Sequence, residues 1–196
     1  MTSPGCVCDD VAVNFFILAA DHDANAAAHA DQHVGKALLE GCQMLCTAHP
    51  EPADREPWIA MAPPERLRRG LLPYKHTHVN SPCGLWTRRR PGNYVWLIHF
   101  AYALAREFEH RFGRAHASLA VVDWCAERAC LVGFAESGAT PSPHVQVMPE
   151  RYRGTDAVEA YRRYYAAEKR VLRGMPATWT RRPRPEWFDQ FEAVKA

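Results

Sequence analysis

The chain lacks the sequence patterns of several large functional classes. No apolar run approaches the ~20 residues that span a bilayer, and no Gly-rich phosphate loop or dinucleotide fingerprint occurs. The zinc-binding patterns Cys-x-x-Cys and His-Glu-x-x-His are also absent. We therefore expect no membrane association, no nucleotide-driven kinase or dehydrogenase chemistry, no cofactor and no metal.

Regular cysteine spacing is missing as well. The seven cysteines are odd in number and do not follow the pattern of a small disulfide-rich domain, and the first residues do not show the charged-then-apolar pattern of a secretory leader. We expect a reduced, cytoplasmic protein. A chain of 196 residues with 47% hydrophobic content buries one sizeable core. We accordingly expect a monomer with one helical domain over residues 13–196, preceded by a flexible extension over residues 1–12.

The fold is expected to begin at Val13. Residues 13–18 read Val-Asn-Phe-Phe-Ile-Leu, which predicts a short strand or an extended entry. A GTG codon encodes valine and also starts translation, so we hypothesise that the native start is Val13. N-terminal sequencing of protein made from the native gene tests this, because Met1 or Thr2 in first place contradicts it.

Apolar residues recur at helical spacing in four segments, which predicts a mainly α protein. Capping and stop residues set the ends, among them Thr155 as an N-cap and Gly113 as a stop. The expected helices cover residues 24–48, 93–113, 117–129 and 155–173. The proline-rich segment 50–91 is expected to be a long ordered, functional loop. The predicted fold class is a helical bundle with at most one short N-terminal strand.

Four ionisable residues of the first expected helix fall at i, i+4, i+7 and i+11. They are His29, His33, Lys36 and Glu40. On a helix they form one polar stripe beside an apolar one, and such an edge is where pKa values shift and chemistry occurs. The alternative is an ordinary amphipathic helix with a solvated charged side.

The segment from Tyr74 to Trp86 crowds titratable and hydrogen-bonding groups into one loop, which favours a binding site. Four of its residues are expected to contact substrate, namely Tyr74, Lys75, His78 and Asn80. In the alternative, Tyr74 and Trp86 only anchor the loop. A metal site using His29, His33, His76, His78 and Cys83 has no specific spacing. A Cys83–His78 nucleophile pair lacks an orienting signature.

Positive charge is concentrated in two blocks. From Arg66 to Arg90 there are seven cations and no acids, and from Arg151 to Arg184 there are ten cations against three acids. Such blocks, interleaved with aromatic residues, are typical of surfaces that neutralise DNA phosphates and stack on bases. The expected DNA contacts are Arg88, Arg89, Arg90, Arg162, Arg163 and Lys169. The alternative is that arginine is simply abundant in this source.

One motif carries a family resemblance. Ala30-Asp31-Gln32-His33, followed seven residues later by Glu40, resembles the N-terminal helix of the T-even phage pyrimidine-dimer DNA glycosylases. Two further stretches are similar to the broader phage and bacterial relatives of those enzymes, namely Tyr74, Pro82 and Trp86, and His99, Glu107, Arg111, Gly113 and His116. The resemblance implies that Glu40 is the catalytic carboxylate, with His33 as its neighbour.

The resemblance also implies a mechanism. An amine attacks the sugar C1′ of a flipped nucleotide in damaged duplex DNA, a Schiff base forms, and β-elimination cuts the strand. The amine is that of Asn14 if translation starts at Val13 and the first residue is removed, and otherwise that of Lys36 or Lys75. The first reading is thus a DNA-repair glycosylase/AP lyase. The alternatives are a phage-type DNA-base or nucleotide modification transferase that uses Lys36, His33 and the Tyr74–Cys83 loop, and a non-catalytic nucleic-acid-binding accessory protein.

Overall fold

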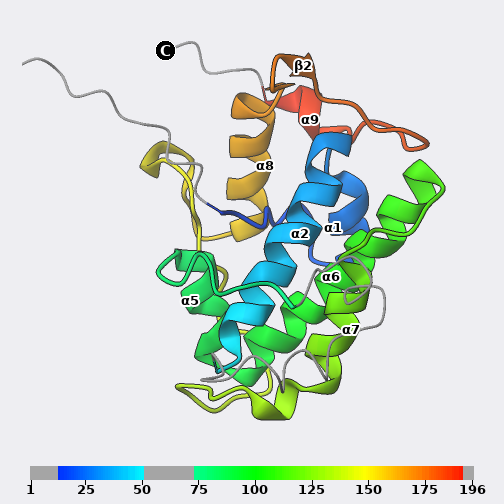
Figure 1. Ribbon diagram of the computed structural model, residues 1–196. Coiled ribbons are helices and arrows are strands. Elements are labelled where there is room, and N and C mark those ends of the chain that lie inside the picture. The colour runs from blue at the N-terminus through cyan, green and yellow to red at the C-terminus, as the bar shows by residue number, and fades with distance from the viewer. Residues whose placement is uncertain (1–12, 51–72, 192–196) are drawn as a thin grey trace, which may run out of the picture.

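The computed structural model describes residues 13–50 and 73–191 and confirms a mainly α fold (Figure 1). The helices are α1 (His22–Ala28), α2 (Asp31–Ala48), α5 (Pro82–Arg89), α6 (Pro91–Phe112), α7 (Leu119–Glu127), α8 (Ala157–Glu168) and α9 (Trp187–Gln190). Short 3-10 turns cover Ala129–Leu131 and Glu150–Tyr152. The expected extension over residues 1–12, the three arginines at 66, 68 and 69 and the first part of the long loop lie outside the described residues.

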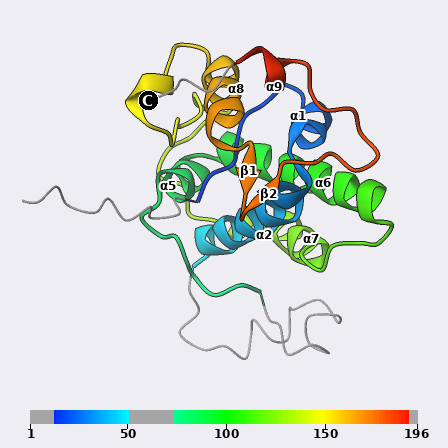
Figure 2. The same cartoon turned by 90° about the horizontal axis from the view of Figure 1, so that it is seen from above.

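Helix α6 is the centre of the core. It packs against α1, α2, α5 and α7, while α8 packs against α9 (Figures 1 and 2). Its buried face includes Tyr94, Leu97, Phe100 and Leu104. Among the described residues, no helix has the length and apolar character needed to cross a membrane.

The expected N-terminal strand is a buried extended segment that forms no strand. Residues 13–18 are buried and lie between α2 and α8, with the Phe16 ring against His33 on one side and Tyr161 and Tyr165 on the other. The apolar side chains of residues 13–18 pack against both α2 and α8, so their burial holds the segment extended without a partner strand.

The helix expected over residues 24–48 is wrong as a single element, because the chain breaks between α1 and α2. His29 and Ala30 are extended, with ψ of 141° and 154°. Carbonyls that would accept helical hydrogen bonds are taken by distant side chains: Arg111 donates to the oxygens of Ala27 and His29, and Trp179 Nε1 donates to Ala28 O. These bonds substitute for the helical ladder and fix the break.

The second and third expected helices are confirmed as α6 and α7. Gly113 ends α6 in the left-handed conformation, at φ 67°. Within the expected loop the chain forms α5, where Ser81 Oγ accepts a hydrogen bond from Gly84 N and Pro82 occupies the first turn.

The fourth expected helix is too long at its end and has a different cap. Asp156, not Thr155, caps α8, since its side chain accepts from Val158 N and Glu159 N. Helix α8 ends at Glu168, and a small antiparallel hairpin follows, with β1 (Val171–Leu172) paired to β2 (Met175–Pro176). Arg173 and Gly174 form its turn, at φ 52° and 78°. A turn with two positive φ values matches the twist of a hairpin, which accounts for these strands where only an N-terminal one was expected.

Candidate functional site

A basic cavity of about 610 Å³ lies where five parts of the chain meet. These parts are the extended segment 13–18, the first turns of α2, the 147–151 segment, the end of α8 and the β1–β2 hairpin (Figure 2). The lining residues are Asn14, Phe16, Gln32, His33, Lys36, Val147, Pro149, Arg151, Tyr164, Glu168, Lys169, Leu172 and Arg173. The volume falls within the range of about 300–1,000 Å³ typical of ligand pockets. The cavity therefore brings together Asn14, His33, Lys36 and Lys169, four of the residues singled out in the sequence.

An amine and a carboxylate form an ion pair beside this cavity. Lys36 Nζ lies 2.6 Å from Glu40 Oε1, one helical turn away on α2. The Lys36 side chain is 32% exposed and that of Glu40 only 12%. The second carboxylate oxygen, Oε2, is buried and has no hydrogen-bond partner among the described residues. The pair thus places a buried carboxylate oxygen next to an amine at the edge of the cavity.

His33 is buried at the cavity wall and is held in one tautomer. Tyr165 Oη accepts from Ala30 N at 3.0 Å and lies 2.6 Å from His33 Nδ1. Burial raises the pKa of the Tyr165 hydroxyl, which therefore keeps its proton, and His33 Nδ1 is the acceptor within its reach. This pattern assigns the remaining proton to His33 Nε2. Nε2–H has no partner among the described residues and remains the ring's donor toward the cavity.

The charge around His33 is strongly positive. Burial, then His29, and then Lys36, Lys169 and Arg173 lower the pKa of His33 to about 3. Arg151 adds a fourth lining cation. The lining carboxylate, Glu168, already accepts from Arg151 and from the Tyr152 hydroxyl. An anion entering the cavity therefore meets several cations whose charge is only partly neutralised.

Asn14 has a structural place in the cavity wall. Its Nδ2 donates to Val147 O at 2.7 Å, and its Oδ1 lies 2.9 Å from the Tyr161 hydroxyl. Its main-chain nitrogen is in a peptide bond with Val13, so in this chain it is an amide. Among the described residues, Lys36 and Lys169 are the primary amines that line the cavity.

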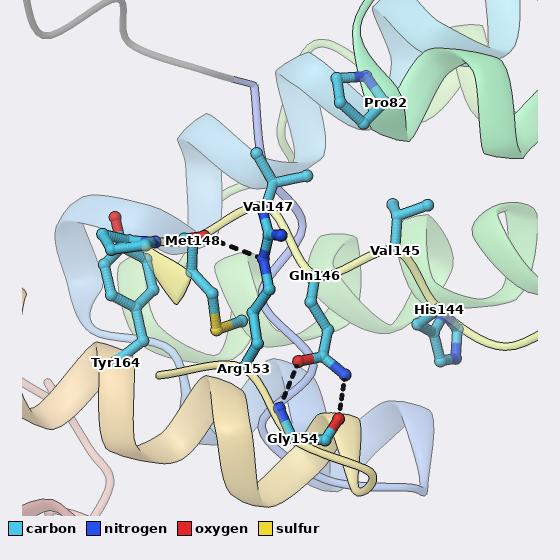
Figure 3. Close-up of a pocket in the computed structure, with 10 residues that line it drawn as sticks. Pro82, His144, Val145, Gln146, Val147, Met148, Arg153, Gly154 and Tyr164 are labelled. Atoms are coloured by element: carbon cyan, nitrogen blue, oxygen red, sulfur yellow. Dashed lines mark hydrogen bonds between the residues drawn. The ribbon is translucent and has the colours of Figure 1, made fainter. Parts of the chain in front are cut away.

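A second, more open cavity of about 760 Å³ shares Val147, Pro149 and Tyr164 with the basic cavity (Figure 3). Gln146 closes part of it by binding Gly154 twice, through Nε2 to the carbonyl oxygen and through Oε1 from the amide N–H (Figure 3). Each end of the Gln146 amide thus makes one hydrogen bond to the backbone, and the remaining wall is mainly apolar.

Other predicted site residues lie away from the basic cavity. His29 is buried in the core, where its Nδ1 binds Asn25 O and burial lowers its pKa to about 4. The Tyr74 loop packs beside the other end of α2, with Tyr74 Oη on Ser118 and Thr77 on Thr47. Thr47 lies 14 residues beyond His33, about 21 Å along the helix axis. Lys75, His78 and Asn80 belong to this same loop, with Lys75 and Asn80 exposed and His78 half-buried.

The predicted DNA-contacting arginines are mostly engaged within the protein. Arg88 donates to Val79 O, while Arg89 and Arg90 both bind Glu136. On α8, Arg162 donates to Leu18 O and covers the Trp187 ring, and Arg163 pairs with Glu159. Apart from Lys169, none of these cations lines the basic cavity.

The Cys83–His78 nucleophile pair and the metal site, both considered from the sequence, find little support in the geometry. Cys83 is fully buried, and burial raises the pKa of its thiol to about 12, so a thiolate is disfavoured. Over residues 13–50 and 73–191, no group of three or more His, Cys, Asp or Glu side chains is arranged to hold a metal ion.

Several residues that line the basic cavity were missed by sequence reasoning. Arg151, Arg173 and Tyr164 were counted only as members of a basic block interleaved with aromatic residues, and Phe16 carried no site signal. The one usable signal is Gly174 after Arg173, which is typical of a tight turn. No family model, curated protein or solved structure matches the chain. The interpretation of the site therefore rests on its own geometry.

Proposed function

We propose that the protein is a DNA glycosylase/AP lyase that acts on damaged, pyrimidine-dimer-like sites and uses Lys36 as its nucleophile. The observation that carries this proposal is the Lys36–Glu40 pair at the edge of a basic, aromatic-walled cavity. An amine beside a carboxylate is the minimum equipment of a Schiff-base lyase, because the carboxylate takes the ammonium proton and frees the nucleophile.

The steps follow from the two side chains. Glu40 accepts a proton from Lys36, and the neutral amine attacks C1′ of the damaged nucleotide. The bond between C1′ and the base breaks, and the base leaves with the proton that Glu40 returns, which restores the Glu40 carboxylate. The C1′–O4′ bond then opens, a proton moves from the attached nitrogen to O4′, and the sugar is joined to Lys36 as a protonated imine. Removal of a C2′ proton by Glu40 then expels the 3′ phosphate, and water releases Lys36.

The wall of the cavity suits a nucleotide that has left the helical stack. Phe16 and Tyr164 supply aromatic faces, with ring centroids 6.2 Å apart, and Lys169 lies 5.1 Å from the Tyr164 ring centroid. Aromatic faces and nearby cations compensate for the stacking and base pairing that a flipped base loses, and a damaged base loses less. Lys36 is preferred over Lys169 as the nucleophile because it has a carboxylate within hydrogen-bond distance.

The test measures base release and strand cleavage on duplexes that contain an abasic site, ultraviolet damage or no damage. We expect Lys36→Arg, which keeps the charge but removes the nucleophilic amine, to abolish cleavage of the damaged duplexes. We expect Glu40→Gln to reduce cleavage about 10²–10⁴-fold, the usual contribution of an acid–base group. Binding of both variants to the same duplexes should stay within a few-fold of the unmodified protein.

Lys75→Arg is the matched control, because Lys75 is an exposed lysine on the distant loop. It should leave cleavage unchanged. Cleavage that survives in Lys36→Arg contradicts the proposal. DNA binding with no cleavage of any duplex favours the accessory-protein reading.

A further inference from the structure

The Nε2–H of His33 is a donor that the fold holds without an internal acceptor. His33 is 8% exposed and lines the basic cavity. Its ring is stacked on Phe16, with centroids 5.1 Å apart, and its other nitrogen is occupied by Tyr165. Because His33 lines the cavity, an acceptor bound there can take a hydrogen bond from Nε2–H in place of water.

Three cations approach this donor from three separate elements. Lys36 comes from α2, Lys169 follows the end of α8, and Arg173 comes from the hairpin. After burial and His29, the positive charge of these three side chains is the next cause of the lowered pKa of His33. Among the described residues, the other charged or titratable groups around the cavity are Glu40 on Lys36, Tyr165 on His33, Tyr164 in the wall, and the Arg151–Glu168 pair with the Tyr152 hydroxyl. A neutral N–H surrounded by cations is a suitable arrangement for an oxyanion.

Arg173 is placed at the cavity by an uncommon backbone conformation. Its φ of 52° is left-handed, which few residues other than glycine adopt without strain. Asparagine or glycine would fit this turn with less strain, yet the position holds an arginine that is exposed and lines the cavity. Strained positions are often found at binding sites, and here the strain accompanies a cation at the cavity.

We propose that His33, Lys169 and Arg173 form a phosphate subsite in the basic cavity and that Tyr165 positions His33 for it. The ligand is the phosphodiester next to the nucleotide whose sugar meets Lys36, so this assignment to DNA rests on the proposed function. The binding of phosphate by the subsite does not depend on the proposed function, because a free phosphate would use the same three side chains.

The experiment is an NMR titration of the full chain with inorganic phosphate, with sulfate and with a four-nucleotide thymidine oligomer. We expect Arg173→Asn and Lys169→Gln each to weaken binding of all three about tenfold or more, the scale of a lost charge-assisted hydrogen bond. Asparagine tolerates the left-handed turn, so Arg173→Asn removes the charge while keeping the hairpin. Arg184→Gln is the control, because Arg184 pairs with Asp189 outside the cavity and should change nothing.

The role of Tyr165 has its own readouts. Sulfate keeps its charge from pH 5.5 to 8, so its affinity for the unmodified protein should be constant over this range, and imidazole ¹⁵N shifts should show a neutral His33 protonated at Nε2. In Tyr165→Phe the imidazole loses the hydroxyl that fixes its tautomer, so the ¹⁵N shifts should show part of the proton on Nδ1 and sulfate affinity should fall. A protonated or Nδ1-protonated His33 in the unmodified protein overturns the assignment even if Tyr165→Phe fails to fold.

The outcomes separate the two proposals. Equal phosphate affinity in Arg173→Asn, Lys169→Gln and the unmodified protein, or no phosphate binding at all, overturns the subsite. If both variants bind inorganic phosphate more weakly but bind the oligomer as tightly as the unmodified protein does, the assignment of the subsite to the DNA strand is overturned. If both variants bind inorganic phosphate and the oligomer more weakly, as expected, but the unmodified protein cleaves no duplex, the phosphate subsite is supported and the lyase proposal fails.

Discussion

At the scale of single residues, Arg111 determines where the site residues lie. It is fully buried and binds Glu107, Asp31 and the two carbonyl oxygens that end α1. By occupying those carbonyls it prevents α1 from continuing into α2. His29 is consequently in the core, whereas His33 begins a new helix and lines the basic cavity.

We predict that Arg111→Ala lowers the free energy of unfolding by about 3–5 kcal/mol, because it leaves the carboxylate of Glu107 buried with one partner fewer. Urea denaturation measures this. The matched control is Arg106→Ala on the same helix, whose pair with Asp23 is exposed on both sides. Arg106→Ala should lower the free energy of unfolding by no more than about 1 kcal/mol. Equal losses in the two variants would contradict the role given to Arg111.

At the scale of elements, the start of α6 is locked to the 138–142 segment. Gly92 N donates to Gly138 O, and Asn93 binds Ser142 through its side chain. A Cβ on Gly92 would lie 2.4 Å from the backbone of Thr140. This close approach sets how α6 meets the strap that leads on to the 147–151 wall of the cavity.

We predict that Gly92→Ala destabilises the protein by at least about 1–3 kcal/mol, because the backbone of Thr140 must move. Gly41→Ala on α2 is the comparison, since its Cβ would meet only Leu97 at an ordinary 3.5 Å. That change should be neutral or stabilise α2 by up to about 1 kcal/mol. Thermal unfolding of the two variants checks the difference, and a stable Gly92→Ala protein would refute the close packing.

The sequence predicts elements whose signals are local. Helix α6 was anticipated from its apolar spacing and from Gly113. The break before α2 was missed because Arg111 and Trp179, more than 80 residues away, impose it. The pairing of Lys36 with Glu40 follows from helical spacing, whereas the approach of Arg173 depends on a hairpin whose turn was not recognised.

At the scale of the whole molecule, the basic cavity depends on long-range assembly. Asn14 binds Val147, and Tyr165 binds both Ala30 and His33, so segments more than 130 residues apart must meet. The net charge is only +2, yet the cavity collects lysine and arginine from α2, α8 and the hairpin. Local potential, rather than net charge, makes it suitable for an anion.

The buried histidines predict how stability depends on pH. Burial lowers the pKa of four of them, to about 3 for His33 and about 4 for His29, His49 and His144. Between these values and the ordinary 6.5, the unfolded chain binds more protons than the folded one. The free energy of unfolding should therefore fall as the pH drops below 6.5, by up to about 1.4 kcal/mol per pH unit for each histidine.

Urea denaturation at pH 5, 6, 7 and 8 tests this dependence. Stability should be nearly constant between pH 7 and 8 and fall steeply from pH 6 to 5. His29→Gln should reduce the slope, while His110→Gln, a change at an exposed histidine, should not. Asp31 and Glu107, whose pKa values arginine partners hold low, lose their contribution only below about pH 4.5. A flat profile from pH 7 to 5 would show that the histidines are not buried as described.

The most direct test of the central claim is borohydride trapping on abasic and ultraviolet-damaged duplexes, followed by mass spectrometry of the peptides. The account predicts a covalent adduct on Lys36 with damaged DNA, weakened in Glu40→Gln and absent in Lys36→Arg. An adduct on another residue, or none with any duplex, would contradict the assignment of Lys36 as the nucleophile.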